Sequence, residues 1–350
     1  MFVSRITPRA AASALGFLAF CGNSLGSSST NTPVATGPKS RVVLVRDPSA
    51  VNGFKFDAAK VRVMVATGMK TLTGKPDEVA AWRVFVSSND VVGIKVNTIG
   101  APLQVTRHEV VDAITDGLQS AGVASTNIIV WDRFALKMSD GGYKINRDGP
   151  GPRVLSVVPD TGYDPKVFYE SKLVGKLIWG DMGFGATELL STKSHLPNLL
   201  THTITKLINV PVLMDHDLCG LMGCLYNVSL GAVDNTRRFD AMQIGSTAPA
   251  EICAIPFVRS KLVLDIADAL IGGYAGGPAF KPQYSWPYGG LYFSRDPVAV
   301  DALCLELIAA QRKAAHVSDI GDRAAHVTIA PKLGLGQADH SNIDVVEVSP

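Results

Sequence analysis

Short β-branched runs alternate with amphipathic helical patterns along this chain, and this alternation limits its fold more than any other feature. Strands are predicted at RVVLVR (41–46), DVVGIKVN (90–97) and NIIVWDR (127–133). Helices are predicted between them, over residues 57–72 with Asp57 as N-cap and over residues 106–122. A repeated strand–helix–strand order predicts an α/β fold with a doubly wound, largely parallel sheet.

The second half of the chain is expected to complete the same sheet. Residues 134–200 are turn-rich with alternating segments, so an inserted or edge β region is predicted there. Pro297 suits the first turn of a helix, and Asp296 is its expected N-cap. Further strands are predicted at 207–213, 261–270, 290–296 and 343–348, and further helices at 218–230, 251–261 and 324–334.

The N-terminus has the pattern of an export signal. Arg5 and Arg9 precede an apolar run over residues 10–21, which is too short to span a bilayer as a stable helix. We therefore expect residues 1–26 to be a signal peptide, 27–40 a flexible lead-in and 41–350 a single domain, exported to the periplasm or the extracellular space. The alternative is that residues 10–21 form an ordinary buried helix.

The charge balance disfavours two classes of partner. The chain has 33 basic and 31 acidic residues, and residues 1–26 contain two arginines and no acid, so the remainder has a formal charge of zero. Without a basic stripe, binding to nucleic acid or to an anionic membrane is not expected. No segment after the signal is long and apolar enough to predict a membrane span.

The segment from Asn209 to Asn227 is the strongest candidate for a functional site. Its apolar strand ends in Asp215, His216 and Asp217, and ligands of α/β proteins bind at the carboxyl ends of strands. A histidine between carboxylates suits a general acid or base, or a metal ligand. The alternative is a turn in which Asp217 caps the following helix.

The cysteines and the metal question stay open. His216, Asp217 and Cys219 are candidate metal ligands, but no HxH or HExxH spacing supports zinc. Cys219 and Cys224 could form a disulfide or remain structural thiols. The other two cysteines after the signal lie in apolar helical patterns, which predicts buried thiols for Cys253 and Cys304.

Four further polar residues are candidates for ligand binding. Lys95 stands in an apolar strand, where an unpaired charge is costly, so it either marks a site or reaches to water. Asn97 lies on the same side of that strand. Asp265 is a strand-end carboxylate or a local cap, and Asp301 either joins the site or complements a helix dipole. The glycine-rich residues 271–280 fit a loop near the site better than a nucleotide cradle.

Several ordered segments together resemble the DUF362 family, a domain of unknown function. They are DVVGIKVN, VVDAITDGLQSAGVASTNIIVWDR, INVPVLMDH with GLMGCLYN, KLVLDIADAL, SRDPVAVDAL and APKLGLG. Some members carry iron-sulfur modules, but this chain has no ferredoxin-type cysteine run, so the resemblance is to a stand-alone form without a known cofactor. Met214 and Tyr226 stand where the family commonly has lysines, which leaves Lys95 and Lys206 as alternative cations.

These observations lead to one expectation for the site. Strand-end residues should converge on one cleft of an enzyme of unknown reaction, redox or metal-assisted, that acts on a small anionic molecule. His216 would be acid, base or ligand, Asp215 would orient it, and Lys95 would hold the anion. A non-catalytic binding or assembly protein and a metal-binding carrier are the alternatives. The other expected cleft residues are Asn97, Asp217, Asn227 and Asp265.

Overall fold

The computed structural model describes residues 39–177, 181, 189–240 and 247–350. The predicted signal (1–26) and nearly all of the lead-in (27–40) lie outside the described residues, so export stays a prediction. None of the helices within the described ranges has the length and apolar character needed to cross a membrane.

A large mixed sheet forms the centre of the described chain, and it confirms the predicted α/β class. Its strands run in the order β14–β1–β13–β12–β9–β4–β5–β6, and the pairs from β12 through β9, β4 and β5 to β6 are all parallel. β13 is antiparallel to both of its neighbours. The strands are β1 (Ser40–Arg46), β4 (Val92–Val96), β5 (Ile128–Phe134), β6 (Arg153–Val158), β9 (Lys206–Val210), β12 (Leu262–Gly273), β13 (Ser285–Ser294) and β14 (Ile343–Val348).

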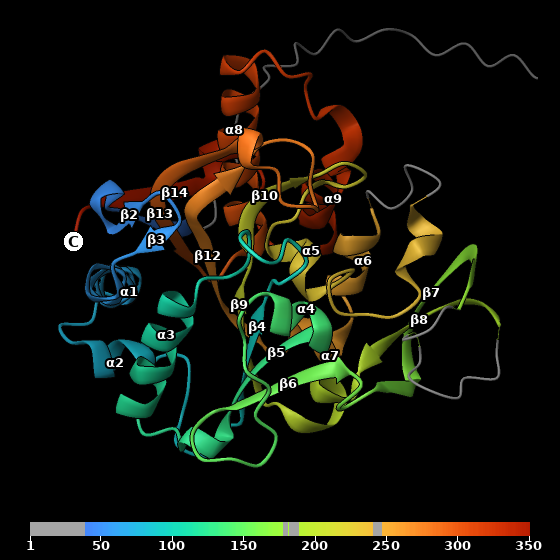
Figure 1. Ribbon diagram of the computed structural model, residues 1–350, viewed down its shortest axis with the longest axis horizontal. Helices are drawn as coiled ribbons and strands as arrows, with labels where there is room; N and C mark the ends of the chain where they lie inside the picture. Colours follow the sequence, from blue (N-terminus) through green and yellow to red (C-terminus); the bar gives the residue numbers. More distant parts are fainter. Residues whose placement is uncertain (1–38, 178–180, 182–188, 241–246) are drawn as a thin grey trace, which may run out of the picture. The chain divides into compact units, whose positions relative to one another are not determined.

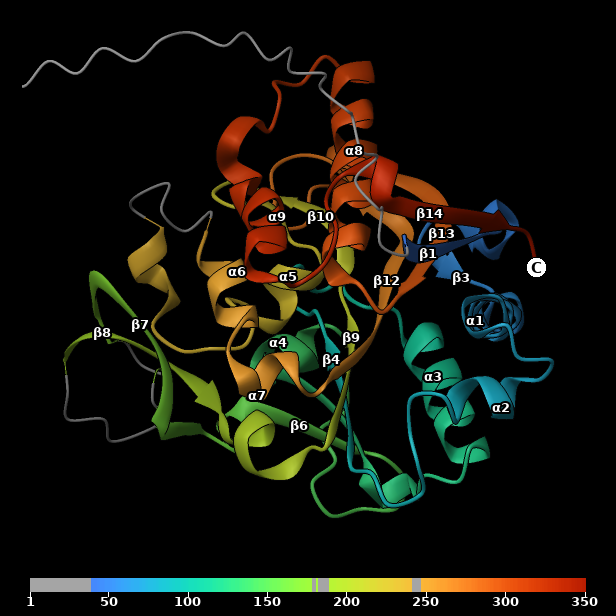
Figure 2. The same cartoon turned by 180° about the vertical axis from the view of Figure 1, so that it is seen from behind.

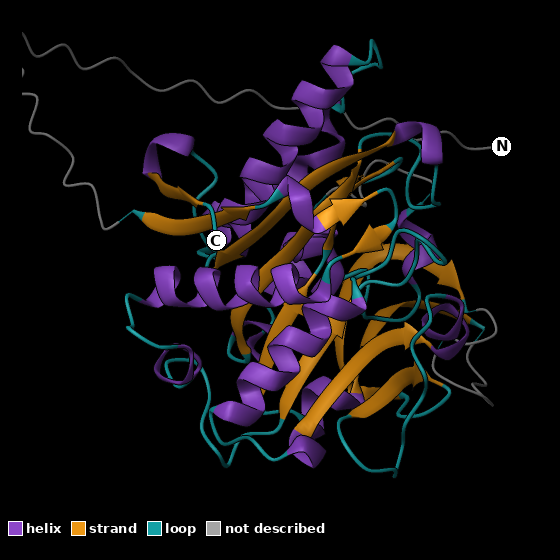
Figure 3. Cartoon of the chain, turned by 60° about the vertical axis from the view of Figure 1, so that its left-hand side comes forward, coloured by secondary structure: helices purple, strands orange, loops and turns teal. Residues whose placement is uncertain are grey.

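Helices cover both faces of this sheet, as a doubly wound fold requires (Figures 1 and 2). One face packs against α1 (Ala58–Thr73), α2 (Glu78–Trp82) and α3 (His108–Ser120). The other packs against α5 (Cys224–Val228), α6 (Ala248–Cys253), α8 (Pro297–Ala314) and α9 (Ala325–Ile329). Because both faces are covered, β4 is buried along its whole length. Figure 3 shows helices packed across the strands.

Local capping rules explain where the longest helices begin. The Asp57 carboxylate accepts hydrogen bonds from the backbone amides of Ala59 and Lys60, which confirms it as the N-cap of α1. Asp296 caps α8 in the same way, with Pro297 in the first turn, as predicted.

The region over residues 134–200 combines two structures. After α4 (Ala135–Asp140), β6 joins the main sheet as its edge strand, parallel to β5. The following strands, β7 (Tyr163–Lys176) and β8 (Leu190–Pro197), form a separate antiparallel pair. The prediction of an edge β region is confirmed by β6.

Proline divides two elements that the sequence pattern predicts as continuous. Pro211 separates β9 from β10 (Val212–His216), and β10 pairs with β12 and with β11 (Gly220–Leu221). Pro256 separates α6 from α7 (Pro256–Arg259). Proline has no backbone N–H and therefore cannot donate to a continuing ladder.

The helix predicted over residues 218–230 is much shorter than expected. Residues 217–219 form a turn and β11 follows, so α5 begins only at Cys224, with Gly223 as its N-cap. The alternative interpretation of Asp217 as a helix cap is therefore wrong.

Candidate functional site

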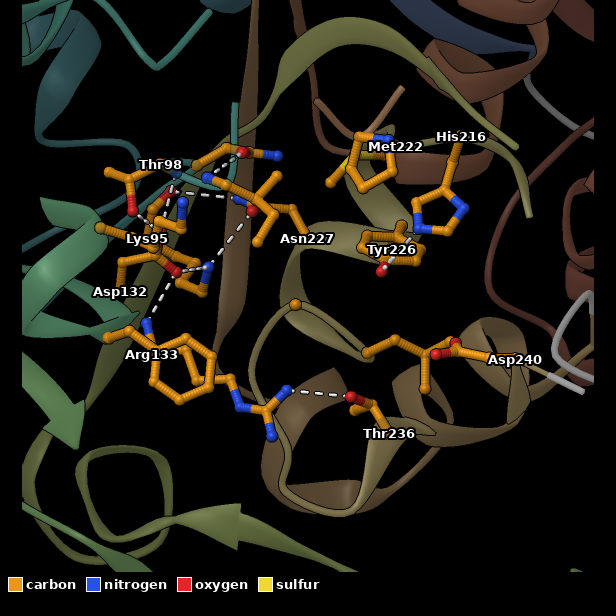
Figure 4. A pocket seen from close by; sticks show the side chains of 17 residues that line it. Lys95, Thr98, Asp132, Arg133, His216, Met222, Tyr226, Asn227, Thr236 and Asp240 are labelled. Atoms are coloured by element: carbon orange, nitrogen blue, oxygen red, sulfur yellow. Dashed lines mark hydrogen bonds and ion pairs between the residues drawn. The ribbon is translucent and has the colours of Figure 1, made fainter. Parts of the chain in front are cut away.

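A cavity of about 180 Å³ lies at the carboxyl ends of β4, β5 and β10, beside α5. This is the predicted position for a ligand site in a parallel α/β sheet. Figure 4 shows side chains from these elements around it. Its polar lining includes Lys95, Asn97, Thr98, Asp132, Arg133, Lys137, His216, Tyr226, Asn227, Thr236 and Asp240.

Lys95 lies at the cavity, but its ammonium group is already engaged. It donates to the Asp132 carboxylate at 2.6 Å, to the Val96 carbonyl at 2.9 Å and to Asn227 Oδ1 at 3.2 Å. These three acceptors use all three protons of an ammonium group. Burial is the main cause that lowers the Lys95 pKa, and the Asp132 charge opposes this shift. The expectation that Lys95 holds a ligand anion is therefore corrected, because its partner is a carboxylate of the protein.

Asp132 is held as tightly as Lys95. Its second carboxylate oxygen accepts the Thr98 amide at 2.8 Å and the Thr98 hydroxyl at 2.5 Å. The first oxygen also accepts the backbone amide of Arg133 at 2.7 Å. The buried Lys95–Asp132 pair therefore joins the ends of β4 and β5 and forms a fixed floor for the cavity.

A hydrogen-bonded chain continues from this floor into the protein. Asn227 on α5 donates to Asn209 Oδ1 at 2.8 Å, and Asn209 donates to Asp265 Oδ1 at 2.7 Å. Asn227 thus lines the cavity as expected. Asp265 is the last residue of this series of hydrogen bonds and lies outside the lining of the cavity. Burial raises the pKa of Asp265 to about 8.

Arg133 and Lys137 are two further basic side chains in the lining of the cavity. Arg133 donates from Nε to the Tyr163 hydroxyl at 3.0 Å, from Nη1 to Thr236 at 2.9 Å and from Nη2 to Asp181 at 2.8 Å. A guanidinium has five N–H groups. One N–H on each Nη atom is therefore left without a partner among the described residues. Arg133 thus forms an ion pair with Asp181, whereas Lys137, at the same wall, has no ion pair within the described ranges.

His216 is held in one tautomer by the turn that follows it. Its Nδ1 accepts the backbone amides of Leu218 at 3.1 Å and Cys219 at 3.2 Å, so Nδ1 carries no proton. Burial lowers the His216 pKa to about 4, and the Arg323 charge lowers it further in the same direction. The neutral ring therefore carries its proton on Nε2, which lies 3.3 Å from the Tyr226 hydroxyl. This arrangement makes His216 a hydrogen-bond donor toward the cavity rather than a general base.

The two aspartates beside His216 lie away from the cavity. Asp215 points to the opposite side of β10, where it accepts the Gly277 amide at 3.0 Å and lies 3.5 Å from Arg312. Burial raises the Asp215 pKa to about 6. Asp217 is exposed in the turn. Neither aspartate makes a contact with the nitrogens of His216, so the predicted orienting role of Asp215 is wrong.

Asp301 has a structural contact that the sequence did not indicate. Its carboxylate accepts the backbone amides of Cys224 at 2.5 Å and Leu225 at 2.9 Å, so it caps α5 from the distant helix α8. A Cβ atom at Gly223 would lie 2.0 Å from this carboxylate, which explains the glycine. Burial raises the pKa of Asp301 to about 7.

The four cysteines after the predicted signal are all buried, as expected for Cys253 and Cys304. Burial raises the pKa of Cys219 to about 12, and it also raises that of Cys224. Neither thiol is therefore activated as a nucleophile at neutral pH.

The residues of the described ranges offer poor support for the predicted metal site. No three or more of their histidine, cysteine, aspartate and glutamate side chains are grouped so that they could hold a metal ion. His216 Nδ1 already accepts two amides, and Nε2 carries the proton, so neither nitrogen presents a lone pair to a cation.

Seven polar residues of the lining are not among the site residues predicted from the sequence: Thr98, Asp132, Arg133, Lys137, Tyr226, Thr236 and Asp240. Asp132 and Arg133 end β5 just as Lys95 ends β4, so the same strand-end rule could have found them. Tyr226 was considered only as a departure from a family pattern. Asp240 lies beyond a 3₁₀ turn and carries no sequence signal. Asn97 joins the cavity as predicted.

Comparison with known families supports the resemblance. The model of the DUF362 family, described as a domain of unknown function, matches residues 189–306. The matched region covers about a third of the chain and is similar to the DUF362 domain. The match contains His216, Tyr226 and Asn227 but not the strands that carry Lys95 and Arg133. The earlier segments of the resemblance therefore lie outside it. No protein with a curated description matches the chain.

A crystal structure with low sequence identity is among the solved structures similar to the chain. It is the crystal structure of a Thermotoga maritima protein, a target of the Northeast Structural Genomics Consortium, with 11% sequence identity and a TM-score of 0.41. The alignment covers 76% of this chain and 61% of that protein, so the chain spans less than two thirds of its length.

Proposed function

We propose that this protein binds a small anionic molecule in the cavity at the ends of β4, β5 and β10. The observation that carries the proposal is the Arg133 guanidinium, which keeps one N–H on each Nη atom without a partner among the described residues. Paired N–H groups of this kind match a carboxylate or phosphate group.

The charge and the volume of the cavity restrict the ligand. Lys95 pairs with Asp132, and Arg133 pairs with Asp181, which lies outside the lining. Lys137 is therefore the lining cation without an ion pair among the described residues, and Asp240 is the remaining carboxylate of the lining. The cavity volume of about 180 Å³ lies below the ~300–1,000 Å³ of pockets for drug-sized molecules. A ligand of a few carbon atoms suits this volume.

Calorimetric titration with phosphate, butanoate, 2-oxobutanoate and succinate tests the proposal. Arg133→Gln should weaken binding by about tenfold or more, since hydrogen bonds to charged groups contribute about 1.5–3 kcal/mol. Lys137→Met should weaken it less and reduce its salt dependence. Lys144→Met is the matched control, because Lys144 is exposed and outside the cavity lining. Binding of none of the four anions, or equal binding by Arg133→Gln, contradicts the proposal.

A second candidate function is catalysis of proton transfer on the bound anion. Asp240 favours it, because this carboxylate lines the cavity and burial raises its pKa while Arg237 opposes the shift. A carboxyl group with a raised pKa is a better candidate for a general acid or base than one with an ordinary pKa. Asp240→Asn should then retain anion binding and lose exchange of the ligand's carbon-bound hydrogen for deuterium, followed by NMR. Exchange at the wild-type rate in Asp240→Asn argues for a binding protein.

A further inference from the structure

We propose that the anion carries a second acceptor oxygen, a carbonyl or a second carboxylate, which receives the hydroxyl proton of Tyr226. This inference rests on the proposed function and names the class of ligand for the same cavity. It follows from the direction of a hydrogen-bonded relay that begins in the backbone of the turn after β10.

The first step of the relay fixes the imidazole. Two backbone amides, of Leu218 and Cys219, donate to His216 Nδ1. A backbone N–H cannot reverse its role, so the ring has to offer a lone pair at Nδ1 and a proton at Nε2. The His216 side chain is buried, and its ring lies beside the Tyr226 ring with centroids 5.0 Å apart.

The second step fixes the phenol. Because Nε2 carries the proton, the contact of 3.3 Å between His216 and Tyr226 has the imidazole as donor and the hydroxyl oxygen as acceptor. The hydroxyl proton of Tyr226 is then free to donate elsewhere. No other partner of this hydroxyl exists among the described residues, and Tyr226 lines the cavity. The proton is therefore available to a ligand atom.

The two ends of the cavity define the ligand. Figure 4 shows the Tyr226 hydroxyl with His216 and, on another side of the cavity, Arg133 with Thr236. Phe134, Met222 and Leu230 supply apolar lining. A short carbon chain would contact these side chains, with its anionic group at Arg133 and its acceptor oxygen at Tyr226. Short 2-oxo acids and dicarboxylates have this pattern, whereas simple fatty acids lack the second acceptor.

Paired probes test this class with the full chain. 2-Oxobutanoate and butanoate differ in one carbonyl oxygen, so calorimetry on the wild-type protein should show about fivefold or greater preference for 2-oxobutanoate. Tyr226→Phe should remove the preference, so that 2-oxobutanoate binds no more tightly than butanoate. Tyr288→Phe is the matched control, because its hydroxyl contacts Tyr292 and lies outside the cavity lining.

His216 is a positioning residue in this relay, which a double-mutant cycle can test. His216→Gln should weaken 2-oxobutanoate binding in the wild-type background and have no further effect in Tyr226→Phe. ¹⁵N NMR of the unliganded wild-type protein should show His216 protonated at Nε2 and unprotonated at Nδ1 across about pH 5 to 8. This NMR readout is independent of the folding of any variant.

The outcomes separate the two proposals. Equal affinity for both acids in the wild-type protein, with Tyr226→Phe unchanged, overturns the second-acceptor inference and leaves anion binding at Arg133 intact. Protonation of His216 at Nδ1 overturns the relay by itself. If neither acid, nor phosphate, nor succinate binds, the proposed function fails and the inference fails with it.

Discussion

Lys95→Met should destabilise the protein strongly, although it places an apolar side chain in an otherwise apolar strand. The variant leaves the Asp132 charge in a site where the Lys95 and Asp132 side chains are only 1% and 9% exposed. Removing one partner of a buried ion pair costs about 3–5 kcal/mol. Asp132 keeps three donors, from Thr98 and the Arg133 amide, so we expect the lower end, about 3 kcal/mol.

Urea unfolding followed by circular dichroism measures this cost, and a thermal scan should show a midpoint lower by roughly 6 °C at about 2 °C per kcal/mol. Lys137→Met is the matched control, because Lys137 has no ion pair within the described ranges and should change stability by less than about 0.5 kcal/mol. Adding Asp132→Asn to Lys95→Met should recover part of the loss. A cost below about 1 kcal/mol for Lys95→Met, or no recovery in the double variant, refutes the buried-pair argument.

Two further predictions concern the buried carboxylates. Burial raises the pKa of Asp265 to about 8, so the native state binds this proton more tightly than the unfolded state does. The free energy of unfolding should therefore fall as the pH rises from about 4 to about 8. The slope should be at most about 1.4 kcal/mol per pH unit. Asp265→Asn should reduce this slope in urea titrations at several pH values, and an unchanged slope would mean that Asp265 is ionised in the native protein. Gly223→Ala should lower the unfolding free energy by about 1–3 kcal/mol, because its Cβ would lie 2.0 Å from Asp301, which caps α5; a calorimetric midpoint equal to wild type contradicts this role.

The sequence predicted those parts of the fold that depend on local rules. Asp57 and Asp296 cap helices because a short acceptor side chain before an apolar helical pattern satisfies the first amides, whatever the tertiary context. The parallel strands were predictable because their apolar runs are buried on both faces. The breaks at Pro211 and Pro256 were not predicted, because apolar residues continue on both sides of each proline.

The site was only partly predictable, because its roles depend on contacts between distant segments. Lys95 was correctly placed at a strand end. Its partner Asp132 is 37 residues away in the sequence, so the ion pair that prevents Lys95 from binding a ligand anion was not predictable from local patterns. Asp301 reaches α5 across 77 residues. The tautomer of His216 depends on two backbone amides in a turn that the pattern predicted as helix.

Pro211 divides the sheet into two branches at the cavity. Up to Val210, β9 lies between β4 and β12, but beyond the proline β10 pairs with β12 and β11, and the Val210 carbonyl accepts the Thr106 hydroxyl. One branch thus carries Arg133 and its charged floor, and the other carries His216. Because no strand pairing among the described residues joins the two branches past this point, substitutions beside His216 can alter one side of the cavity without disturbing the strand register that holds Arg133.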